Sequence, residues 1–192
     1  MKNKKILLLV CVICLMGTGC TSYVPSNNSP FASIKELKDL NGIYQNAGEG
    51  ELTRVLYLSS LIWKNDKKLN HKEITSIQIK ANDAEILSVR AIADGNIKKE
   101  SLFRLNKDFV LSSGKIPFKD AWGIPVPILG IGYKSSKIGI DRSSNGKYKE
   151  NVTVAGLFAC LIPLFMTGSE EFRFQRIQPQ PNPKPKDNED KK

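Results

Sequence analysis

The chain has 192 residues and a formal net charge of +10, and 41% of its residues are hydrophobic. Once the terminal segments described below are set aside, about 145 residues remain, which is enough for one well-buried domain. Three of the four cysteines lie within the first twenty residues, which excludes an internal disulfide from that domain. The fourth, Cys160, stands in an apolar run, and we expect it to behave as a small buried hydrophobe.

The first twenty residues have the layout of a secretory signal. Residues 2–5 include three lysines, an apolar run extends from Ile6 to Met16, and three small residues, Gly17–Gly19, lead to Cys20. Eleven apolar residues are too few for a helix that spans a bilayer, which needs roughly 20. Two other interpretations stay open: an ordinary secretory signal in which Cys20 is incidental, and an uncleaved membrane anchor.

A cysteine placed directly after small residues resembles the lipobox of bacterial envelope lipoproteins. The resemblance covers about the first 20 residues and implies that the leader 1–19 is removed. It also implies that Cys20 becomes an acylated first residue carrying two or three acyl chains, the number needed for stable attachment. In that family an Asp after the cysteine favours the inner membrane. Thr21 and Ser22 follow here, so the resemblance implies the outer membrane, facing the periplasm, in a Gram-negative source. In a Gram-positive source it implies the outer face of the cytoplasmic membrane.

Without the leader lysines the charge is about +7, which suits anionic lipid headgroups or acidic polymers. The lysines are scattered, and we expect them to be solvated; nucleic acid is a poor partner for an exported protein. We expect residues 20–32 to form a flexible tether, residues 33–177 a globular domain, and the Pro- and Lys-rich residues 178–192 a disordered tail. The expected partners are the membrane, through the acyl chains, and an envelope protein or lipid. The oligomeric state is left open.

Apolar spacings of three and four predict an amphipathic helix over residues 51–64, and Ser33 with Glu36 suggests a short helical turn over residues 33–40. The spacing then changes to two. Alternating apolar residues predict short strands joined by turns at 82–83 and 94–96, within the ranges 75–80, 87–93, 101–111, 137–142, 148–154 and 171–177. The pair Asn145-Gly146 predicts a type I′ hairpin turn. The sum is a mainly β fold, an antiparallel meander of about eight strands forming a barrel or a sandwich with one early helix.

Three further segments carry specific expectations. The apolar run 157–165 is too short to span a membrane, and we expect a central strand buried on both faces. The segment 122–127 is expected to be a rigid connector whose Trp122 caps the core, although it could also line a ligand mouth. Gly130-Ile131-Gly132 lacks the spacing of a phosphate loop and is expected to be a strand or bend with close backbone packing.

No residue pattern points to catalysis, a metal or a cofactor. The only histidine, His71, lies in a polar run and is expected to be a solvated loop residue, which argues against a Ser-His or Cys-His catalytic set. The acidic pairs 170–171 and 187/189 are expected to be solvated, and no metal-ligand spacing occurs. We therefore predict a non-enzymatic binding or envelope-maintenance module with Cys20 as its lipid-attachment site. The alternatives are a lipocalin-like carrier of a small apolar ligand and an enzyme using Asp, Glu or Ser.

Overall fold

A computed structural model of the chain describes residues 18–25, 28–50, 54–124, 128–158 and 162–177. Two five-stranded sheets make up most of it. The first has the order β1-β11-β10-β9-β8, and the second has the order β12-β2-β5-β6-β7. The strands of the first sheet are β1 (Thr18–Tyr23), β8 (Ile116–Ile124), β9 (Ile128–Ile140), β10 (Gly146–Phe158) and β11 (Ile162–Phe174). Those of the second are β2 (Gly42–Gln45), β5 (Ser76–Ala81), β6 (Ile86–Ala93), β7 (Asn96–Arg104) and β12 (Arg176–Ile177).

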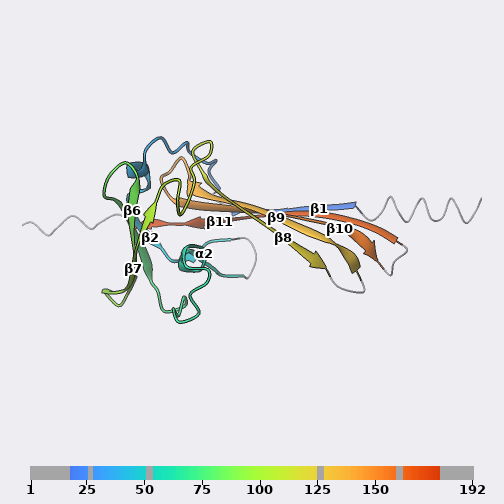
Figure 1. The fold of residues 1–192 in the computed structure, drawn as a ribbon, viewed down its shortest axis with the longest axis horizontal. Helices are drawn as coiled ribbons and strands as arrows, with labels where there is room; N and C mark the ends of the chain where they lie inside the picture. The colour runs from blue at the N-terminus through green and yellow to red at the C-terminus, as the bar shows by residue number, and fades with distance from the viewer. Residues whose placement is uncertain (1–17, 26–27, 51–53, 125–127, 159–161, 178–192) are drawn as a thin grey trace, which may run out of the picture.

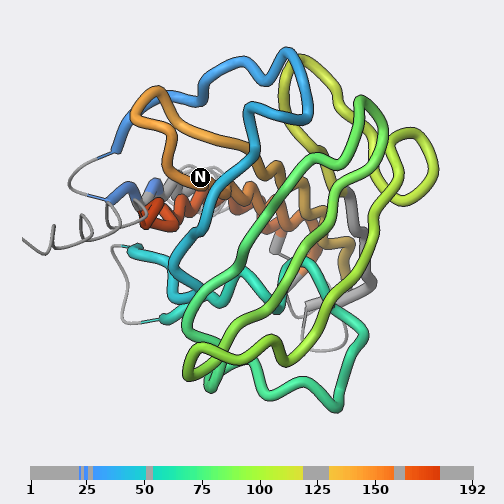
Figure 2. Tube along the Cα trace, turned by 90° about the vertical axis from the view of Figure 1, so that its left-hand side faces the viewer, coloured from blue at the N-terminus to red at the C-terminus, as the bar shows by residue number. Residues whose placement is uncertain are grey.

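The two sheets share one core. Figures 1 and 2 show the second sheet crossing one end of the first, with the strands of the two sheets running in different directions. Phe172 and Phe174 of β11 are fully buried, as are Ile77 of β5 and Ala91 of β6. These alternating inward positions confirm the mainly β fold predicted from the period of two. The described strands form two packed sheets and not a closed barrel.

Most of the predicted strands are confirmed. The stretches around 75–80 and 87–93 are β5 and β6, and residues 171–174 belong to β11. Gly130 lies in β9, where an added Cβ would sit 2.4 Å from the carbonyl oxygen of Ala155, which is the close backbone packing expected there. Asp94 and Gly95 both have positive φ, 52° and 74°, as a two-residue type I′ turn between β6 and β7 requires.

The predicted helix over residues 51–64 is wrong in length. Only Leu58–Ile62 form a helix, α2, while residues 51–53 lie outside the described chain. Leu56–Tyr57 form a short strand, β4, paired with β3 (Ala47–Gly48). This pairing engages the backbone that the first helical turn would need, so the helix starts only at residue 58. The helical turn expected over 33–40 is a 3₁₀ turn, η1 (Leu37–Leu40), and its N-cap is Glu36 rather than Ser33.

The hairpin between β9 and β10 is confirmed, but its turn lies earlier than predicted. Asn145 accepts a backbone bond from Asp141, and Ser144 has a φ of 64°. The Asp141 carboxylate accepts bonds from the backbone N–H groups of Ser143 and Asn145, at 2.8 and 2.9 Å. This side-chain cap closes a longer loop, so Gly146 begins a strand instead of completing a two-residue turn.

The apolar run 157–165 is not a central strand buried on both faces. Its described residues lie at the end of β10 and the start of β11, on either side of residues 159–161, and Leu157 and Phe165 are exposed. Cys160 lies outside the described residues. Trp122, expected in a connector, lies within β8 opposite Gly132. Figure 1 shows β8–β11 extending well beyond the second sheet and α2, so no other described helix or sheet covers this end of the first sheet.

The stretch expected to be a flexible tether is attached to the first sheet over much of its described length. Residues 18–23 form β1, which pairs in parallel with β11. Further along, Phe31 forms a bridge with Asp141, and the N–H of Ala32 donates to the carbonyl of Ile140 at 2.9 Å. The described part of this segment is therefore an element of the fold.

Candidate functional site

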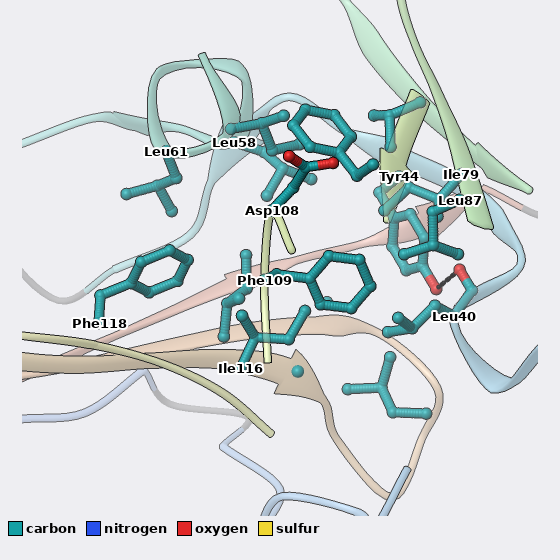
Figure 3. Close-up of a pocket in the computed structure, with 17 residues that line it drawn as sticks. Leu40, Tyr44, Leu58, Leu61, Ile79, Leu87, Asp108, Phe109, Ile116 and Phe118 are labelled. Carbon is teal, nitrogen blue, oxygen red and sulfur yellow. Dashed lines mark hydrogen bonds between the residues drawn. The ribbon is translucent and has the colours of Figure 1, made fainter. Parts of the chain in front are cut away.

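An apolar cavity of about 160 Å³ lies between the two sheets. Both sheets and the segment around α2 contribute to it, so its walls come from parts of the chain that are far apart in sequence (Figure 3). The lining is dominated by aliphatic and aromatic side chains. It consists of Leu40, Tyr44, Leu58, Leu61, Ile62, Ile79, Leu87, Val89, Phe103, Asp108, Phe109, Ile116, Phe118, Ile138, Gly139, Ile140 and Gly146.

Two polar side chains stand in this wall. The Tyr44 hydroxyl donates to the carbonyl of Leu40 at 2.9 Å, so its hydrogen-bonding capacity is already engaged (Figure 3). Burial raises the pKa of Tyr44, although the positive charge of Arg176 acts in the opposite direction. Asp108 accepts a bond from the backbone N–H of Arg104 at 2.7 Å and is exposed to solvent. The cavity therefore suits an apolar group, and its lining offers no nucleophile paired with a base.

Two of the residues that line the cavity are exposed to solvent: Asp108, on the loop after β7, and Phe118, on β8. Leu87, Val89 and Tyr44 also line the cavity and are buried. Figure 3 shows Phe118 and Tyr44 on opposite sides of the cavity.

The size of the cavity bounds its occupant. An engineered apolar cavity of about 150 Å³ holds a benzene molecule, whereas sites for drug-sized ligands are usually about 300–1,000 Å³. The cavity matches one aromatic ring or a short length of alkyl chain. A whole phospholipid tail would have to leave most of its length outside.

Neither Cys20 nor His71, the residues singled out in the sequence, lines this cavity. The backbone of Cys20 lies in β1, opposite Thr167 of β11. His71 lies in a loop, as expected, but it is half-buried, and its Nδ1 lies 3.0 Å from the Ser59 hydroxyl. Ser59 is fully buried, so this pair joins the loop to α2 and does not present a nucleophile to substrate.

Asn46, which no sequence pattern singled out, organises this region. It is fully buried, and its side-chain amide donates to the carbonyls of His71 and Ile74 at 2.8 and 3.0 Å. Its side-chain oxygen accepts the backbone N–H of Ser59 at 2.7 Å. One amide thus satisfies three backbone groups and holds α2 over the second sheet. A single Asn before a helix carries no pattern from which this role could be read.

A charged cluster on the outer face of the first sheet also escaped prediction. Glu171 was expected to be solvated, but its buried carboxylate forms ion pairs with Lys147 and Lys149 at 2.7 and 2.8 Å. Glu170, also expected to be solvated, is mostly buried and lies 3.5 Å from Arg54. The acidic pair 187/189 lies outside the described residues. This cluster could have been predicted in part from the sequence. Lys147 and Lys149 alternate with inward residues, and this spacing of two places both lysines on one face of β10.

Lysines gather around Phe31 beside this cluster. The ammonium groups of Lys115, Lys137 and Lys147 lie 5.2, 5.7 and 5.2 Å from the ring centre. Burial, together with the like charges of Lys115 and Lys149, lowers the pKa of Lys137. The expectation that the lysines are uniformly scattered and solvated is therefore wrong for this face of the sheet.

Within the described residues, no group of three or more His, Cys, Asp or Glu side chains is placed to hold a metal ion. The described part of the chain also contains no helix long and apolar enough to cross a membrane. Comparison with protein-family models, curated proteins and solved structures finds no match to this chain.

Proposed function

We propose that the protein is a lipid-anchored lipoprotein of the bacterial envelope whose β domain binds a small apolar ligand without transforming it. The observation that carries the ligand-binding part is the cavity of about 160 Å³ between the sheets, whose lining is almost entirely apolar. Of the functions considered from the sequence, the small-ligand carrier is favoured by this cavity.

The proposed anchor is Cys20, acylated after removal of residues 1–19. Its support is the basic start, the short apolar run and the small residues before the cysteine. In a Gram-negative source the anchor would place the domain at the outer membrane, facing the periplasm. Metabolic labelling with a clickable fatty acid tests this point: label should enter the wild-type protein and be absent from Cys20→Ala. Label that persists in the variant would overturn the assignment.

The proposed absence of catalysis is supported by the chemistry of the cavity wall. Its one carboxylate, on Asp108, is exposed, and its one hydroxyl, on Tyr44, is bonded to a carbonyl. General acid–base work requires a group whose pKa and position suit the reacting proton. An apolar wall with engaged polar groups fits binding instead.

Ligand binding can be tested with benzene as a minimal probe. In the full-length protein, titrated benzene should shift the NMR methyl signals of Leu87, Val89 and Ile138, which line the cavity. Val89→Phe should fill the space and abolish these shifts, whereas Leu102→Phe, on the exposed face of β7, should leave them intact. If the two variants respond equally, the cavity is not the binding site. Saturating benzene without any shift would remove the basis for a carrier.

A further inference from the structure

The projecting half of the first sheet carries no charge. Residues 121–133 and 151–169 include no Asp, Glu, Lys or Arg, although a quarter of the whole chain is charged. Their described residues belong to the ends of β8, β9, β10 and β11 that extend past the second sheet (Figure 1). We call this half of the sheet, in its described residues 121–124, 128–133, 153–158 and 162–167, the sheet tip.

The register of the strands makes the boundary of the sheet tip sharp. Thr153 of β10 lies opposite Tyr133 of β9 and Thr167 of β11, and no charged residue lies at this level or beyond it. One step inward, Val152 lies opposite Lys134, which in turn lies opposite Asp120. Charged residues therefore begin at the same level in two neighbouring strands, as they do at the edge of a membrane-facing surface.

Both faces of the sheet tip expose large apolar side chains. Ile131, Leu157 and Phe165 lie on one face, and Ile131 and Phe165 are 67% and 52% exposed. Met166, the next residue along β11, is exposed on the other face. A sheet in water normally covers one face with a core and keeps the other polar. A surface apolar on both sides suits surroundings that are themselves apolar.

The position of Cys20 indicates that these apolar surroundings are the hydrocarbon of a lipid leaflet. In β1 it lies opposite Thr167, at the level where the charged residues stop. An acylated cysteine sits at the interface, with its acyl chains in the hydrocarbon and its glyceryl group among the headgroups. The sheet tip extends from that level for five residues, 154–158 of β10, or about 17 Å at 3.4 Å per residue. One leaflet of hydrocarbon is about 15 Å thick.

We propose that the sheet tip inserts into the lipid leaflet that holds the acyl chains of Cys20, giving the protein a second membrane contact beside its anchor. The orientation of this contact rests on the proposed anchor, whereas its apolarity does not. Tyr133 lies at the interfacial level and Trp122 one step beyond it, where aromatic residues are favoured. Lys119 and Lys134 follow on the water side, where lysines attract anionic headgroups.

The open edges of the sheet limit how deep the tip goes. Within the described residues, the outer edge of β8 has no neighbouring strand, and each backbone group left unpaired there costs several kcal/mol in hydrocarbon. A single copy therefore enters only as far as its edge groups can keep water or headgroup partners. Two copies joined edge to edge would remove this limit, and deeper insertion at high surface density would be the sign of it.

Tryptophan quenching tests the insertion. The chain has two tryptophans: Trp63, buried beside β7, and Trp122 in the sheet tip. Protein purified from its own membranes as Trp63→Phe and reconstituted in liposomes should show Trp122 emission quenched at least twofold by lipids brominated on the acyl chain. In Trp122→Phe, emission from Trp63 should change by less than a tenth under the same conditions.

Matched substitutions locate the contact. Phe165→Asp and Ile131→Asp should each reduce the quenching of Trp122 severalfold. Leu102→Asp, at a side chain 60% exposed on the second sheet, should leave it unchanged. Trp122 that stays unquenched in folded protein overturns the proposal. A blue-shifted, concentration-dependent emission would then show that a second copy covers the tip instead of lipid.

The same preparation separates this proposal from the proposed anchor. Mass spectrometry of the N-terminus reports whether Cys20 is acylated, independently of the fluorescence. Acylated protein with unquenched Trp122 keeps the anchor and rejects the inserted tip. Unacylated protein with quenched Trp122 does the reverse, since the tip would then hold the membrane alone.

Discussion

Lys147 and Glu171 form an ion pair of 2.7 Å between neighbouring strands although their side chains are only 4% and 8% exposed. Lys147 also donates to the side chain of Asn28 and to the carbonyl of Ser29, the latter at 2.7 Å. The segment after β1 thus covers the pair and supplies its remaining hydrogen bonds. A buried charge pair of this kind is tolerated only when such additional partners are present.

Removing the carboxylate should therefore be costly. Glu171→Gln leaves Lys147 buried without its counter-charge, and we expect a loss of about 3 kcal/mol in the free energy of unfolding, measured in urea. The matched control is Glu100→Gln, in the exposed pair with Arg90 at 2.8 Å, which should cost less than about 1 kcal/mol. Equal losses in the two variants would show that burial contributes nothing to the Lys147–Glu171 pair.

The same pair should make stability depend on pH. Burial raises the pKa of Glu171, but hydrogen bonds from Lys147 and Lys149 more than offset it, so the pKa lies below 4.5. A depressed pKa stabilises the fold above the unfolded value and loses that contribution as pH falls through the folded value. We expect the wild-type melting temperature to fall below pH 4.5 more steeply than that of Glu171→Gln. Parallel curves would contradict this assignment.

The buried hydrogen bonds of Asn46 should also contribute strongly to the free energy of unfolding. Asn46→Ala leaves the N–H of Ser59 and the carbonyls of His71 and Ile74 without partners, and each unsatisfied buried group costs about 1–3 kcal/mol. We expect a loss of more than about 3 kcal/mol and early exchange of the amides in α2, measured by hydrogen–deuterium exchange. Asn70→Ala, at an exposed residue bonded to Glu73, is the control and should change the free energy of unfolding by less than about 0.5 kcal/mol.

Gly95 and Gly114 allow the cost of a positive φ to be measured separately from the cost of a steric clash. Gly95 and Gly114 both have positive φ, 74° and 68°, which a side chain makes unfavourable by about 1–2 kcal/mol. An added Cβ at Gly114 would also lie 2.7 Å from the backbone nitrogen of Ile34, while nothing lies within 4 Å at Gly95. Gly114→Ala should thus lower the melting temperature clearly more than Gly95→Ala. Similar shifts would show that this loop yields to the added methyl.

The cavity predicts that a destabilising core substitution beside it is partly rescued by an apolar ligand. Leu87→Ala should cost about 2–5 kcal/mol, because it enlarges an existing space. Benzene should recover part of that loss by binding the folded state only, and the recovered free energy should grow with the logarithm of its concentration. Thermal unfolding with and without benzene measures both. A variant that benzene does not stabilise would mean that the enlarged site has collapsed.

The sequence predicted the fold where local pattern and tertiary packing agree. The period of two in β5 and β6 reports a face that is buried in the folded protein, and Asp94-Gly95 forms the turn that its residue types favour. The helix over 51–64 failed because strand pairing at Leu56–Tyr57 outcompetes helical periodicity, which a single sequence does not reveal.

The candidate site was largely beyond sequence reasoning. Its walls come from both sheets and from the segment around α2, so no local spacing marks it. Likewise, the apolar pattern of 157–165 is equally typical of a segment buried in protein and of one that faces another apolar medium. Only the structure shows that Leu157 and Phe165 are exposed.

The attachment of residues 28–32 to the first sheet has a consequence for the reach of the protein. A domain on a flexible tether would sample many tilts and heights above a membrane, whereas this attachment would hold the proposed anchor at a fixed position relative to the first sheet. The cavity begins three residues along β8 from the level of Cys20, at Phe118, and extends to seven residues along β10, at Gly146. These separations correspond to about 10 to 23 Å along the strands. The cavity would then lie in the aqueous space at a fixed distance from the membrane surface. Its ligand would have to arrive through water or from a partner that reaches the same distance from the membrane.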